Sequence, residues 1–211
     1  MHEEILKGLQ WRYAVKVFDP TKKITQEQLM MVLESGRLAP SSLGTEPWKF
    51  LVVENPEIRA KLRQAAYGQP KVTDAPYLIV ITRRTDAREN ISRELIERTA
   101  ATHGVQHSDL DALKQMVDGG ISRQTEAEVD AWVRAQTYIP LGMMIETAAL
   151  LGIDAGPMEG FNPAEVDKIL GLKEKNLAST SMLALGHRGE DPYAKKPKVR
   201  RKFEDVVEFI K

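Results

Sequence analysis

Two cations near the start of the chain have a spacing that suits an elongated ligand. Arg12 and Lys16 lie in a stretch of alternating residues, 12–18, which indicates a strand or an extended arm. In such a segment residues 12, 14 and 16 face one side, so the two charges stand about 13 Å apart. That is close to the span of a mononucleotide from phosphate to ring, and the small Ala14 lets the backbone approach it. Taken alone, the segment is explained as well by a solvated strand edge.

Two loops carry groups that bind anions or flat ligands. Pro40, Ser41 and Ser42 follow a predicted helix, where hydroxyl and backbone N–H groups can bind phosphate oxygens. A plain helix-to-strand turn has the same composition. In the segment 157–161, a glycine lets backbone N–H groups approach a planar ligand, whereas the acid before it could instead cap the helix that begins at Pro163.

A basic run near the end of the chain, residues 195–201, repeats the pattern of alternate cations. Lys198 and Arg200 would project to one side of an extended segment and could clasp a phosphate. The alternative is a solvated cluster of charges. The four histidines do not suggest a metal site, because His103 and His107 flank Gly104 and no HExxH pattern is present.

The composition narrows the function classes. Lysine plus arginine and aspartate plus glutamate number 30 each, so the net charge is zero and favours neither nucleic acid nor an anionic membrane as a partner. The chain has no cysteine, which excludes thiolate catalysis and iron–sulfur clusters and suits a reducing cytoplasm. The apolar stretch 139–151 is too short to span a bilayer and contains Glu146, so we interpret it as a central helix covered on every side.

Helices interleaved with a few strands must position these residues. The patterns predict helices at 3–9, 25–37, 56–66, 86–119 (with breaks near Gly104 and Gly119–Gly120), 125–152 (kinked at Pro140) and 163–170. Strands are expected at 48–53, 77–82 and 178–186, with a strand-like turn at 154–161. We therefore expect an α+β sandwich whose mostly antiparallel or mixed sheet has helices on its faces, formed by residues 1–211 as a single domain.

The four motifs, in this order, resemble the nitroreductase family of FMN-dependent NAD(P)H oxidoreductases. They are Arg-x-x-x-Lys-x-Phe-Asp near the start, Pro-Ser-Ser-x-x-x-x-Pro-Trp, Pro-x-Glu-Gly-Phe after the apolar helix, and Lys-x-Arg near the end. The resemblance covers nearly the whole chain and is weakest between about 85 and 125. It implies an intertwined homodimer with FMN at the subunit interface, NADH or NADPH as electron donor, and a nitroaromatic, a quinone or a similar small molecule as acceptor.

The resemblance also assigns roles to residues. Arg12, Tyr13, Ala14 and Lys16 would line the flavin from one side, and Pro40, Ser41 and Ser42 would come from the partner subunit. Gln69 or Lys71 would meet the polar edge of the ring, and Lys198 and Arg200 would hold the phosphate. The turn of Pro157, Met158, Glu159 and Gly160 would pack on the flavin, with a backbone N–H of Glu159 or Gly160 directed to N5. No side chain need act as a general acid, since the flavin N5 does the chemistry.

The chain departs from the family pattern at a few positions. Family members often have serine at the position of Ala14, and many have asparagine and glutamine at those of Gly44 and Glu46. We expect Glu46, near the mouth of the site, to disfavour anionic substrates. A lysine beside the N1–O2 side of the flavin, Lys16 or Lys71, would stabilise its reduced form.

The absence of a dinucleotide-binding fingerprint implies a ping-pong cycle in which nicotinamide and acceptor visit the same flavin face. Alternatives are a specialised chemistry of the same superfamily, such as reductive dehalogenation or flavin breakdown, and a flavin-binding protein without turnover.

Overall fold

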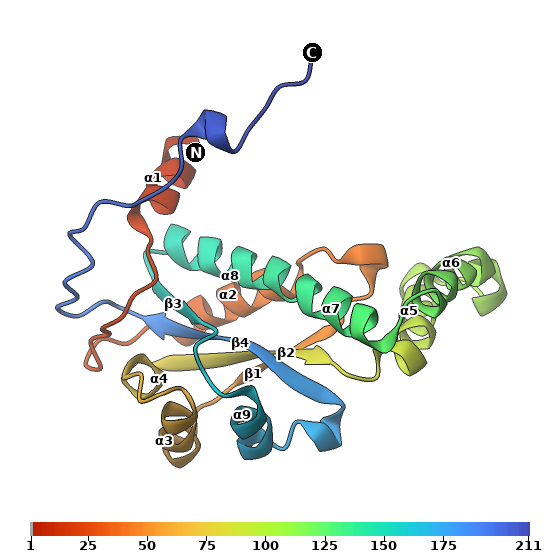
Figure 1. The fold of residues 1–211 in the computed structure, drawn as a ribbon, viewed down its shortest axis with the longest axis horizontal. Helices are drawn as coiled ribbons and strands as arrows, with labels where there is room; N and C mark the ends of the chain where they lie inside the picture. Colours follow the sequence, from red (N-terminus) through yellow and green to blue (C-terminus); the bar gives the residue numbers. More distant parts are fainter. Residues whose placement is uncertain (1) are drawn as a thin grey trace.

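The computed structural model describes residues 2–211, and its centre is a four-stranded sheet with the order β1–β2–β4–β3 (Figure 1). The strands are β1 (Trp48–Val52), β2 (Tyr77–Arg84), β3 (Asp154–Met158) and β4 (Leu177–Gly186). All pairings between these four strands are antiparallel, and helices lie on both faces of the sheet. The predicted α+β class and the antiparallel sheet are therefore confirmed.

Apolar side chains point to both faces of the central strands, so helices must cover both faces of the sheet. On β2, Leu78 and Val80 belong to one hydrophobic cluster and Ile79 and Ile81 to another, because successive side chains point to opposite faces. The first cluster is closed by α3 and α9 and the second by α2 and α8. The α-helices are α1 (His2–Trp11), α2 (Gln26–Arg37), α3 (Pro56–Ala65), α4 (Lys71–Asp74), α5 (Ala87–His103), α6 (Asp111–Ser122), α7 (Glu126–Gln136), α8 (Tyr138–Leu150) and α9 (Pro163–Leu170).

Local capping sets the start of the helices that carry the site. Helix α2 begins with the predicted capping box, in which Thr25 accepts a hydrogen bond from the N–H of Gln28 and Gln28 accepts one from the N–H of Thr25. Helix α9 begins at Pro163 after the N-cap Asn162, whose side chain accepts from the N–H of Glu165. These helix starts were predicted to within a residue.

Two details of the predicted helices are wrong. The long helical stretch is not merely kinked at Pro140 but divides into α7 and α8 at Thr137, because Pro140 in the first turn of α8 has no N–H to donate. The pair Gly119–Gly120 does not end a helix, since α6 continues to Ser122. The neighbouring Val117 and Ile121 pack in a hydrophobic cluster with α5 and α7, and this packing outweighs the low helix propensity of glycine.

The apolar helix α8 is also not covered on every side within one chain. Met144 and Ala148 are buried against the sheet, whereas Ile139 is 38% and Leu150 50% exposed. Helices α5 and α6 project from one end of the molecule, and the C-terminal segment leaves from the opposite end beside α1 (Figure 1). None of the helices formed by residues 2–211 has the length and apolar character that a bilayer crossing requires.

Candidate functional site

The two ends of the chain meet around one cavity. It has a volume of about 370 Å³, and its walls include Arg12, Tyr13 and Ala14 from the N-terminal arm together with Lys198 and Arg200 from the C-terminal segment. The Lys198 ammonium joins the two segments, because Nζ donates to the carbonyl oxygen of Leu9 at 2.6 Å and to that of Arg12. Two motifs separated by most of the chain thus form one cationic site.

The cavity has the electrostatics of an anion site. Burial and the nearby Arg200 lower the pKa of Arg12, and burial together with Arg12 and Arg200 lowers the pKa of Lys198. The Nε of Arg12 is buried without a hydrogen-bond partner. A buried donor without a partner and cations that repel one another would both be stabilised by a phosphate, so the residues present fit such a group.

Asp191 holds the N-terminal arm in its extended shape. One carboxylate oxygen, Oδ2, accepts hydrogen bonds from the backbone N–H groups of Lys16 at 2.8 Å and Val17 at 3.3 Å. The other, Oδ1, accepts from the N–H of Tyr193 at 2.9 Å. These bonds lower the pKa of Asp191 against the opposing effect of burial, so the carboxylate stays charged. The Lys16 side chain remains exposed.

Arg188 and Asp154 support the same arm from behind. The guanidinium of Arg188 lies 4.2 Å from the ring centre of Trp11 and 4.6 Å from that of Tyr13. Its Nε donates to the buried carboxylate of Asp154 at 2.7 Å. Burial, followed by the interaction with Asp191, raises the pKa of Tyr13 well above its ordinary value. Sequence reasoning missed Arg188, Asp154 and Asp191, and their separation along the chain offers no local signal.

A second group of residues surrounds a buried lysine. Lys71, at the start of α4, is 3% exposed, and its Nζ donates to the carbonyl oxygen of Pro157 at 3.3 Å. Burial, followed by repulsion from Lys16, lowers the pKa of Lys71 to about 8. Gln69 reaches the same turn, since its Nε2 donates to the carbonyl oxygen of Gly160 at 2.7 Å. The predicted residues Lys16, Gln69, Lys71 and the 157–160 turn are therefore neighbours.

The side chain of Glu159 holds the turn after β3 in place. The carboxylate of Glu159 accepts a hydrogen bond from the Tyr138 hydroxyl and lies 3.5 Å from the guanidinium of Arg134. The N-cap of α9 is Asn162, so the alternative that Glu159 caps this helix is wrong. Met158 is buried in the sheet, whereas Glu159 and Gly160 are exposed.

The loop Pro40–Ser42 contacts the opposite part of the molecule. The N–H of Ser42 donates to Oε1 of Gln136 in α7 at 2.8 Å, and the carbonyl oxygen of Gly44 accepts from Arg98 of α5 at 2.9 Å. Pro40, Ser41 and Ser42 do not line the cationic cavity. The same holds for the predicted site residues Lys16, Gln69, Lys71 and 157–160, which gather around the buried lysine instead.

Comparisons with known proteins find relatives along almost the whole chain. The family model described as "Nitroreductase family" matches residues 9–187. A Bacillus subtilis protein that carries the provisional name NAD(P)H nitroreductase YfkO is 38% identical over 218 residues, which cover 98% of this chain and 97% of that protein. A similarly named Staphylococcus aureus protein is 38% identical over 221 residues, which cover 100% of this chain and 97% of that protein.

Two solved structures share the fold. One, provisionally described as the nitroreductase ydfN of Bacillus subtilis, has a TM-score of 0.87 with 22% identity, and the match covers 100% of both chains. Another, provisionally described as a nitroreductase of Exiguobacterium sibiricum in complex with FMN, has a TM-score of 0.81 with 22% identity, and the match covers 99% of this chain and 96% of the other.

Proposed function

Because the chain belongs to the nitroreductase family, we propose that it is an FMN-dependent oxidoreductase that transfers electron pairs from NADH or NADPH to a small acceptor. The observation that carries the proposal is the cavity where Arg12, Lys198 and Arg200 converge. Nitroaromatic compounds and quinones are the proposed acceptors. The names of the full-length relatives support NAD(P)H as the donor.

Each part of the site suits a different part of FMN. The cations Arg12, Lys198 and Arg200, beside Tyr13 and Ala14, would hold the phosphate. Lys71, Lys16 and Gln69 would meet the polar edge of the ring, and the turn 157–160 would pack on the ring with an N–H toward N5. Pro40, Ser41 and Ser42 would reach FMN from a second subunit. The proposal needs no metal.

The chain's own contribution to the reaction is electrostatic. When bound, FMN supplies two-electron redox chemistry. A charged Lys71, held in position by its hydrogen bond to the Pro157 carbonyl oxygen, would stabilise electron density at the polar edge of the ring. The sequence contains no Gly-rich dinucleotide fingerprint, which supports a ping-pong order in which donor and acceptor use one face in turn.

A homodimer completes the proposal. Exposed apolar side chains gather on α1, α2, α8 and the C-terminal segment, and permanent interfaces are large and hydrophobic. They include Leu6, Leu9, Met30, Met31, Ile139, Leu150, Phe209 and Ile210. We expect light scattering to give the mass of two chains for the FMN-loaded protein, and a stable FMN-loaded monomer would contradict this part.

The proposal extends to the organisation and location of the chain. Residues 1–211 would form one domain, because the sheet joins strands from the first and last thirds of the chain. The lack of cysteine supports a cytoplasmic location.

The direct test is the colour and cofactor content of the purified protein. We expect a yellow protein that releases FMN on heating, identified by mass spectrometry, and that oxidises NADH or NADPH when a nitroaromatic or quinone is added. A colourless protein that takes up no added FMN would contradict the proposal. Halogenated phenols and the fate of the flavin itself, tested as alternative acceptors, would reveal a specialised chemistry.

A further inference from the structure

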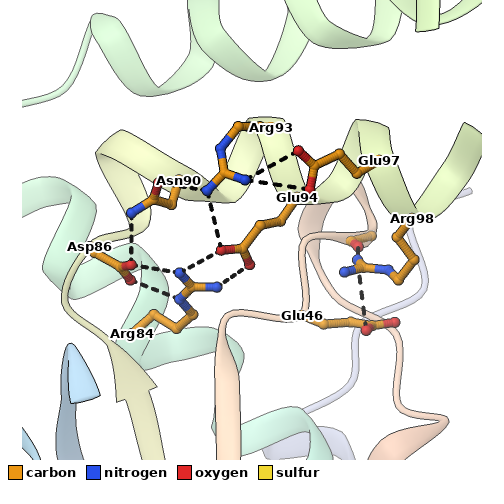
Figure 2. A network of polar contacts seen from close by, with 9 residues as sticks. Glu46, Arg84, Asp86, Asn90, Arg93, Glu94, Glu97 and Arg98 are labelled. Atoms are coloured by element: carbon orange, nitrogen blue, oxygen red, sulfur yellow. Dashed lines mark hydrogen bonds and ion pairs between the residues drawn. The ribbon is translucent and has the colours of Figure 1, made fainter.

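Helix α5 reaches the serine loop through one side chain. The Arg98 guanidinium donates to the carbonyl oxygen of Gly44 at 2.9 Å and lies 3.7 Å from the Glu46 carboxylate (Figure 2). It thus contacts the backbone and the side chain of the loop that follows Ser41 and Ser42. No sequence motif explains why the charged region 87–103 should contact this loop.

The loop adopts a conformation that must be held from outside. Leu43 has a φ of 57° and Glu46 a φ of 47°, both in the left-handed region that non-glycine residues rarely adopt. Such residues persist where their surroundings fix them. Arg98 contacts Glu46 and the intervening Gly44, so it is placed to supply that restraint.

The position of Glu46 in turn determines what Ser41 can do. The Oγ of Ser41 accepts a hydrogen bond from the N–H of Glu46 at 2.8 Å, which leaves the hydroxyl proton for another acceptor. The N–H of Ser42 is already donated to Gln136. The backbone N–H of Ser42 is therefore occupied, whereas the Ser41 hydroxyl is held by the loop through its oxygen and can donate its proton to an anion.

Helix α5 is itself anchored to the sheet. Arg84 at the end of β2 pairs with Asp86 at 2.6 Å and with Glu94 of α5 (Figure 2). Hydrogen bonds to these two carboxylates raise the pKa of Arg84. Contacts from β2 to Glu94 hold α5 in place, and Arg98 of the same helix in turn holds the serine loop.

We propose that Arg98 is a positioning residue for FMN. By holding Gly44 and Glu46, it presents the Ser41 hydroxyl to the phosphate of the FMN that the other subunit binds with its cationic cavity. This inference rests on the proposed function. It gives Glu46 a structural role, because the Glu46 carboxylate pairs with Arg98 rather than facing a substrate.

The first test compares flavin affinities of two α5 variants. For Arg98→Ala we expect FMN to bind about three- to tenfold more weakly, as for the loss of one half-exposed charged contact, and riboflavin, which has no phosphate, to bind as before. Arg93→Ala is the matched control, because the partners of Arg93 are Asn90, Glu94 and Glu97, all on its own helix. It should bind both flavins like the wild type.

A double-mutant cycle separates positioning from general support of the fold. Ser41→Ala should weaken FMN binding about tenfold, and adding Arg98→Ala should then cost nothing more, because both changes remove the same contact. Arg98→Lys, which keeps the charge, should retain part of the affinity.

Equal losses for FMN and riboflavin, or additive losses in the cycle, would overturn the inference. So would unchanged FMN binding by Arg98→Ala in a protein whose wild type binds FMN. A wild type that binds no FMN would instead overturn the proposed function.

Discussion

The cations at the two ends of the proposed FMN site are held in opposite ways. Lys71, at the ring end, is buried beneath the 157–160 turn, and its pKa is lowered to about 8. Arg200, at the phosphate end, lies on an exposed segment, and its guanidinium donates to the carbonyl oxygen of the adjacent Val199 at 2.6 Å. Desolvation penalises the first charge, whereas the second must be ordered when a ligand binds.

This difference suggests that the two cations have different roles, one in the reaction and one in ligand binding. A buried, preorganised cation is suited to stabilising charge that develops during a reaction, because it need not move. An exposed cation on an extended segment is suited to capturing a charged ligand, because it stays hydrated until contact. Substitutions at the ring end should therefore change turnover, and those at the phosphate end should change affinity.

The largest effect is expected for Lys71→Met, which keeps the length of the side chain and removes its charge. We expect kcat to fall about 100-fold, as when one preorganised stabilising group is lost. The FMN-free variant should nevertheless melt at a higher temperature than the wild type, since the buried charge is gone. Steady-state kinetics and thermal unfolding measure the two effects.

Lys16→Met is the matched control for that substitution. Lys16 is exposed, so its loss should change the melting temperature little and kcat less than the loss of Lys71. A Lys71→Met variant with normal kcat, or one less stable than the wild type, would contradict the role given to the ring end.

At the phosphate end, Arg200→Ala should weaken FMN binding about ten- to a hundredfold, since charge-assisted hydrogen bonds are lost. Riboflavin binding should hardly change. Arg201→Ala is the control, because residue 201 faces away from residue 200 in an extended segment and lies outside the set that lines the cavity. The measurement is a titration of each variant with both flavins at one salt concentration. An equal loss of affinity for FMN and riboflavin would show that Arg200 supports ring binding or the fold rather than phosphate binding.

The smallest expected effect is a pH dependence of the free energy of unfolding that Lys71 causes. The pKa of Lys71 is about 8 when folded and ordinarily 10.5, so between these values the unfolded chain holds a proton that the folded chain has lost. The destabilisation by Lys71 is thus complete below pH 8 and disappears as the pH rises toward 10.5. Urea unfolding should show the stability advantage of FMN-free Lys71→Met shrinking over that range, and an advantage that grows with pH would contradict the assignment.

Most of the fold was predictable because the local signals agree with the tertiary structure. Thr25 and Gln28 specify the start of α2, and the alternation in β2 matches its two buried faces. The exposed side of α8 was not predictable, since its apolar composition is the same whether a sheet or a second chain covers it. The break at Thr137 was not predicted, because a proline can either kink a helix or stand in the first turn of a new one. Pro140 lies in the first turn of α8.

For the proposed site, sequence motifs supplied the candidate residues but not the residues that hold them in place. Lys198 and Arg12 were both identified from their spacing, and the structure joins them. Asp191 was missed, since its carboxylate binds the backbone of Lys16 across 175 residues of sequence. Arg98 was missed because an arginine on a charged helix has no local pattern that indicates its partner.

The contact between Lys198 and the first helix determines when the site can form during translation. The carbonyl oxygens that Lys198 binds belong to Leu9 and Arg12, 189 and 186 residues earlier in the chain. A ribosome therefore synthesises one half of the phosphate site at the beginning and the other near the end. A polypeptide that stops after Gly186 contains all four strands but lacks Lys198 and Arg200. Under the proposed function, such a truncated product would remain pale, so the ratio of flavin absorbance to protein absorbance would report how many molecules in a preparation retain an intact C-terminus.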